Sequence, residues 1–93
     1  MTPHQKATEH LYMLLKDAAD TDVFRRTVEV TPGARIVRER EMMFTDGTTA
    51  LQMTVAMPDG TQWRFTPASE GEIARQRQAG RWLTRFAGMR IGA

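Results

Sequence analysis

The chain has 93 residues, which is the size of one small domain and leaves no room for a second. Its 13 Lys and Arg residues exceed its 11 Asp and Glu residues by only two, so net charge does not demand a nucleic-acid partner. The lack of cysteine excludes disulfides and thiolate chemistry and favours a cytoplasmic setting. No apolar run approaches the roughly 18 residues of a membrane span, so no membrane partner is expected. We expect a single domain over residues 1–93.

The N-terminal segment predicts a helix over about residues 3–19. Thr2 can cap this helix, Pro3 suits its first position, and Gln5 completes a capping box. Its apolar residues share one face: Ala7, Leu11, Leu14, Leu15 and Ala18. We expect that face to pack on the rest of the domain.

The middle of the chain predicts four strands. Runs of β-branched and alternating apolar residues mark them. They lie at about residues 24–31, 35–44 and 51–57, followed by a strand that contains Trp63 and Phe65 and ends at Pro67. Because the links between them are short, the sheet is predicted to be an antiparallel meander.

Two similar stretches, Thr45-Asp46-Gly47-Thr48 and Pro58-Asp59-Gly60-Thr61, are interpreted as two turns of this meander. Asp46-Gly47 predicts a hairpin with a two-residue loop. Pro58-Asp59-Gly60 predicts a three-residue turn that ends in a left-handed glycine.

The C-terminal segment predicts a second helix, which begins with a capping box at Ser69 and Glu72. One face of this helix is apolar, with Ala79, Trp82, Leu83 and Phe86, and the opposite face carries Arg77, Arg81 and Arg85. Gly80 favours a kink or break. Two helices on one face of the sheet would complete a two-layer α+β domain.

The first hairpin decides where a group of arginines lies. A two-residue turn places Arg38 and Arg40 on the helix-covered face, and Arg26 joins them from the first strand. A slip of one residue would instead turn Glu39 and Glu41 inward. In the first register the arginine stems lie along the core rim with their heads in water, or they form a basic groove for phosphate or acidic protein groups.

The sequence contains no catalytic motif. His4 and His10 are the only histidines, and no third ligand accompanies them, so neither a metal nor another cofactor is expected. Ser69 is the only serine, and its predicted role as a helix cap accounts for it. We therefore expect that the protein is not an enzyme.

These observations predict a small non-enzymatic binding protein that acts through a protein–protein interface, as an adaptor, an inhibitor or a regulatory subunit. The alternative is a nucleic-acid or nucleoprotein-binding accessory protein of bacterial or phage type that uses the arginine-rich helix face. The candidate partner-binding residues are Arg26, Arg38, Arg40, Arg77, Arg81 and Arg85. A homodimer through an edge of the sheet is a further expectation.

Overall fold

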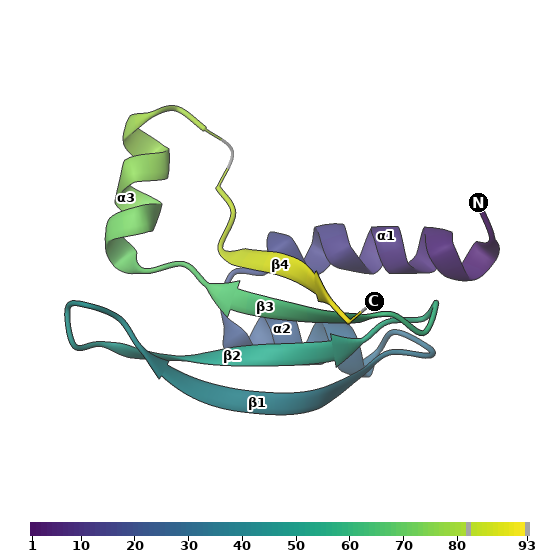
Figure 1. Cartoon of the computed structure of the whole chain (residues 1–93). Helices are drawn as coiled ribbons and strands as arrows, with labels where there is room; N and C mark the ends of the chain where they lie inside the picture. Colours follow the sequence, from purple (N-terminus) through teal and green to yellow (C-terminus); the bar gives the residue numbers. More distant parts are fainter. Residues whose placement is uncertain (82, 93) are drawn as a thin grey trace.

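The computed structural model describes residues 1–81 and 83–92. Its elements are α1 (Pro3–Lys16), α2 (Thr21–Glu29), β1 (Arg35–Met43), β2 (Thr49–Ala56), β3 (Gln62–Pro67), α3 (Glu70–Gln78) and β4 (Phe86–Ile91). The strands form one antiparallel sheet in the order β1-β2-β3-β4. In Figure 1, α1 and α2 lie behind one face of this sheet, and α3 stands beyond the end of β3. The predicted fold class, a two-layer α+β domain with a four-stranded antiparallel sheet, is confirmed. Three of the predicted strands form β1, β2 and β3. The predicted first strand lies mostly in α2 instead, and β4 forms from the end of the segment that was predicted as the C-terminal helix.

Helix α1 begins as predicted. The Thr2 hydroxyl accepts a hydrogen bond from the Gln5 amide at 3.1 Å, and the Gln5 side chain accepts one from the Thr2 amide at 2.9 Å. Leu11 and Leu15 are fully buried, because they lie one helical turn apart on the side that faces the sheet. Leu14, which was predicted on the same face, is 45% exposed.

The segment predicted as the first strand, residues 24–31, lies mostly in helix α2. The Asp20 side chain accepts a hydrogen bond from the Val23 amide at 2.8 Å and caps this helix. Phe24 and Val28 are both buried. Residues four apart share a face in a helix and also in a strand, so their spacing fits both structures. The cap at Asp20 is the local feature that separates the two.

The predicted C-terminal helix ends at Gln78, well before Phe86. Gly80 takes the left-handed conformation, with φ of +66°. Its amide donates to the Arg77 carbonyl, and the Arg81 amide donates to the Gln76 carbonyl, which is the pattern of a Schellman cap. The break predicted at Gly80 is therefore the end of a helix. Strand β4 follows, and Trp82, predicted on the helix face, lies outside the described residues.

The turns at residues 44–48 and 57–61 have the same structure. In each, the amide of the first residue donates to the carbonyl of the last at 2.8 Å. The aspartate of each accepts hydrogen bonds from the amide and hydroxyl of the threonine two residues later. The glycines have φ of +88° and +87°. Hydrogen bonds from the Thr48 hydroxyl and amide hold the pKa of Asp46 below its ordinary value.

The prediction of a two-residue loop at Asp46-Gly47 is therefore wrong, whereas the three-residue turn at residues 58–60 is confirmed. One additional residue in the first turn shifts the pairing of β1 with β2. Arg38 pairs with Thr54, and Glu39 pairs with Met53. Because neighbouring residues of a strand point to opposite faces, this shift moves the side chains of residues 38–43 to the other face of the sheet. A bulge between Ile36 and Arg38 restores the earlier alternation, so Ile36 stays on the helix side, opposite Val55.

The hydrophobic core lies between the sheet and the layer formed by α1 and α2. The Phe24 ring lies 5.3 Å from the Phe65 ring and 4.9 Å from the Phe86 ring, measured between centroids. The core residues are Leu11, Leu15, Ala18, Phe24, Val28, Met53, Val55, Met57, Phe65 and Phe86. All of the core strand residues point to one face, which leaves the other face of the sheet without a helix over it (Figure 1).

Candidate functional site

The uncovered face of the sheet carries four arginines and no carboxylate among the strand residues that the structure describes. The registers and the alternation of side chains assign its residues. They are Arg35, Arg38, Arg40 and Met42 of β1, Ala50, Gln52, Thr54 and Ala56 of β2, Gln62, Arg64 and Thr66 of β3, and Ala87, Met89 and Ile91 of β4. We refer to this surface as the arginine face.

Pairing across three strands places two of these arginines on either side of one threonine. Thr54 of β2 pairs with Arg38 of β1 and with Arg64 of β3. Only 7% of Thr54 is exposed, although no helix lies over it. We attribute this burial to the long aliphatic stems of the two arginines, which can cover the shorter side chain between them.

A small notch opens at the centre of the arginine face. It is lined by Arg38, Arg40, Gln52, Thr54 and Arg64 and has a volume of about 10 Å³. Within the described part of the chain, none of its guanidinium groups pairs with a carboxylate, whereas Arg25 and Arg75 both do. The notch is therefore lined by unpaired positive charge.

Strand β1 separates acidic from basic side chains. Arg38 and Arg40 point to the arginine face, and Glu39 and Glu41 point to the side of the helices. There the Nε of Arg25, from α2, donates to the Glu39 carboxylate at 2.9 Å. Among the described residues of β1, the ion pair with a neighbouring element thus lies on the helix side, and the arginine face keeps a positive field.

Two of the predicted partner-binding residues lie together, but not where they were predicted. Arg38 and Arg40 lie on the uncovered face, whereas the sequence placed them on the helix-covered side. Arg26 was predicted beside Arg40 on a neighbouring strand, and it lies exposed on α2 instead. Both differences follow from the helix at residues 21–29 and from the additional residue in the first turn.

The other three predicted residues do not form a stripe on one helix. Arg77 lies in the last turn of α3, and Arg81 follows the Gly80 cap. Arg85 is half-buried just before β4, where its amide donates to the Lys16 carbonyl at 3.2 Å. The helix face that was to contact phosphates is therefore not formed.

The sequence also contained a signal for three residues that were not predicted as candidates, namely Gln52, Thr54 and Arg64. Arg35, which was not predicted either, reaches this face only through the bulge between Ile36 and Arg38. The two similar turn stretches differ only in Thr45 and Pro58. Had they been assigned the same three-residue turn, the observed register would have followed. That register places Arg38, Arg40 and Arg64 together.

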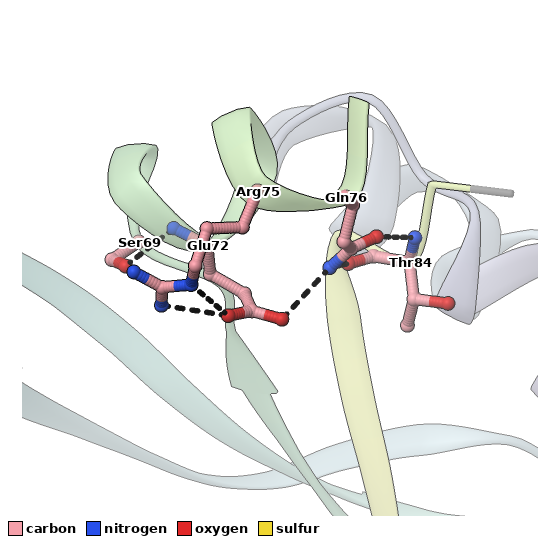
Figure 2. Close-up of polar contacts among 5 residues, drawn as sticks. All are labelled: Ser69, Glu72, Arg75, Gln76 and Thr84. Carbon is pink, nitrogen blue, oxygen red and sulfur yellow. Dashed lines mark hydrogen bonds and ion pairs between the residues drawn. The ribbon is translucent and has the colours of Figure 1, made fainter. Parts of the chain in front are cut away.

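Polar contacts around α3 fix the segment that follows it, and Figure 2 shows them. The Gln76 side chain donates to the Thr84 carbonyl at 3.2 Å and accepts from the Thr84 amide at 2.7 Å. The Arg75 guanidinium donates to Glu72 at 2.7 Å. That hydrogen bond, the charge of Arg75 and the Gln76 amide hold the pKa of Glu72 below its ordinary value. These contacts stabilise a loop and hold no reactive group.

Replacing Gln76 with Ala is expected to lower the free energy of unfolding by about 2 kcal/mol, because two backbone groups of Thr84 lose their partner. Gln76 is buried, whereas Gln78 of the same helix is exposed and serves as the control. Urea denaturation measures both variants. Equal losses from Gln76→Ala and Gln78→Ala would contradict the role assigned to Gln76.

The described residues contain no group of three or more side chains that could hold a metal ion. None of their helices has the length and apolar character that crossing a bilayer requires. Comparison with protein-family models, with curated proteins and with solved structures finds no match to this chain. The proposal below therefore depends on the geometry of the arginine face alone.

Proposed function

We propose that the protein is a small non-enzymatic binding protein that uses the arginine face to bind an acidic surface of a protein partner. It would act as an adaptor, an inhibitor or a regulatory subunit. The observation that carries this proposal is a sheet face with four arginines, no carboxylate and no covering helix among the described residues. Guanidinium groups bind carboxylates through paired, charge-assisted hydrogen bonds, so an acidic protein surface complements this face.

Two observations favour a protein over a nucleic acid. Single-stranded nucleic acids bind sheets through bases that stack on exposed aromatic rings. The rings of Tyr12, Trp63 and Phe65 contact one another on the helix side instead, and the arginine face has no aromatic residue among its described positions. In addition, the helix stripe on which the nucleic-acid alternative depended is not formed.

The geometry of the two sheet edges also favours a partner that is a different protein over a partner that is a second copy of this chain. Symmetric pairing of two β1 edges would place the arginines of the two copies opposite each other, which is destabilising. Pairing of two β4 edges about 4.8 Å apart would crowd the α1 helices, which pack against β4 and need about 8–10 Å between their axes. The homodimer through a sheet edge stays a prediction, although these two arguments make it less favourable. The cytoplasmic setting also stays a prediction.

Neutralising the arginine face is expected to weaken binding to labelled polyglutamate by about 30-fold at 50 mM salt. The test variant is R35Q/R38Q/R40Q/R64Q. Four exposed charge pairs at about 0.5 kcal/mol each amount to about 2 kcal/mol, and 1.4 kcal/mol corresponds to a tenfold change in affinity. Fluorescence anisotropy measures the dissociation constants.

The matched control is R26Q/R77Q/R81Q/R90Q, which removes as many charges from exposed positions outside the arginine face. We expect it to keep most of the affinity. Equal losses in the two variants would show that net charge, and not this face, determines binding. Tighter binding to random-sequence DNA than to polyglutamate, with a steep salt dependence, would favour the nucleic-acid alternative.

A further inference from the structure

The notch on the arginine face has the composition of an anion site. Thr54 lies between Arg38 and Arg64, and Arg40 and Gln52 complete the lining. Its volume of about 10 Å³ matches one water-sized group. One oxygen of a bound group can therefore enter the notch, whereas a larger group must remain above it.

Four of the five residues around the notch carry hydrogen-bond donors that have no acceptor among the described residues. In the described part of the chain, neither the Thr54 hydroxyl nor the guanidinium groups of Arg38, Arg40 and Arg64 form a hydrogen bond or an ion pair. Guanidinium groups only donate, and three of them around one small space repel each other. A negatively charged acceptor in the notch would relieve this repulsion and would receive several charge-assisted hydrogen bonds.

Gln52 is already held in place. Its Nε2 donates to the Thr66 hydroxyl at 2.9 Å, so this part of the lining is held in place before any ligand binds. Because the Gln52 side chain is already held, less of its conformational entropy is lost when a ligand binds.

We propose that the notch is a carboxylate subsite that takes one Asp or Glu side chain from an extended acidic segment of the partner. The inference rests on the proposed function and adds the chemical group and the conformation of the ligand. A carboxylate places one oxygen in the notch and the other between the guanidinium groups, which suits their forked donor geometry.

The spacing of the arginines indicates the conformation of the ligand. Arg38 and Arg40 are two residues apart on one face of β1. Alternate side chains of an extended chain repeat about every 6.6–6.8 Å. An extended segment with acidic residues at alternate positions has the same repeat. When one carboxylate occupies the notch, the next therefore lies one repeat further along β1, on the Arg40 side of the notch.

The test compares two short labelled peptides of identical composition. In one, Glu and Thr alternate, and in the other the same Glu residues form one block. We expect the alternating peptide to bind about fivefold more tightly. Arg64→Gln is expected to weaken its binding about tenfold and Thr54→Val about threefold, and both variants should reduce the preference for the alternating peptide.

Matched controls are Arg77→Gln, which removes an exposed charge outside the arginine face, and Thr49→Val, which removes an exposed hydroxyl from the same strand as Thr54. Neither should change the affinity. The Nε–Hε signals of Arg38 and Arg64 should shift on addition of the alternating peptide, and that of Arg77 should not. Thermal unfolding of each variant verifies that it folds.

Three outcomes would overturn the inference. In the first outcome, the two peptides bind equally and Arg64→Gln and Thr54→Val lose no more affinity than the controls. This result would contradict the carboxylate subsite but not the proposed function. Stronger competition by inorganic phosphate than by acetate would assign the notch to phosphate. The proposed function would also be refuted if neither peptide binds and the R35Q/R38Q/R40Q/R64Q variant binds polyglutamate as tightly as the unchanged protein does.

Discussion

Replacing Phe24 with Ala is expected to lower the free energy of unfolding by about 4 kcal/mol. Phe24 is fully buried, and its ring lies 5.3 Å from the Phe65 ring and 4.9 Å from the Phe86 ring. The variant loses both ring contacts and leaves a cavity between α2 and the sheet. Because small domains are stable by only about 5–15 kcal/mol, a large part of the total stability depends on this side chain.

The neighbouring substitution Val23→Ala is the control. Val23 is 44% exposed on α2, and alanine favours a helix more than valine does, so we expect a change within about 0.5 kcal/mol. Urea denaturation followed by circular dichroism measures both variants. Comparable losses at the two positions would mean that residues 21–29 do not form a helix with Phe24 on its buried side.

Replacing Gly88 with Val is expected to lower the free energy of unfolding by about 3 kcal/mol. A Cβ atom at this position would lie 2.6 Å from a ring carbon of Tyr12 and 2.7 Å from a ring carbon of Phe65. Phe65 is fully buried and cannot move aside without disturbing the core. Gly88 is therefore needed for the close contact of β4 with α1, and not for an unusual backbone conformation.

Ala87→Val provides the comparison for Gly88→Val. Ala87 lies next to Gly88 but points to the arginine face, where it is exposed. Valine suits a strand, so a change within about 0.5 kcal/mol is expected. Thermal and urea denaturation measure both variants. A neutral Gly88→Val substitution would contradict the packing of α1 on β4.

Much of the fold was predictable because its signals are local. The capping box at Thr2 and Gln5 marks the start of α1, and the alternation through Met53 and Val55 marks β2. The turn at residues 57–61 follows from a glycine that can take a positive φ. Each of these features depends on residues a few positions apart, so the sequence pattern is sufficient.

The two wrong elements have different physical causes. Phe24 and Val28 share a face in either a helix or a strand, and β-branched neighbours favoured the strand. At the other end, the arginine spacing suggested a continuous helix, but Gly80 stops it with a left-handed residue. Strand β4 then forms because β3 offers it a free edge, which is a contact with residues about 25 positions earlier in the chain.

The sequence by itself determined the α+β class, the start of α1, the central strands and the arginines that the chain has available. Only the tertiary structure decided which face of the sheet those arginines occupy. The side-chain period of a strand is two residues, so one additional residue in the turn at residues 44–48 moved Arg38 and Arg40 from the covered to the uncovered face. The packing of α1 and α2 on the opposite face then left those arginines beside Arg64, with no carboxylate from the described strands to neutralise them.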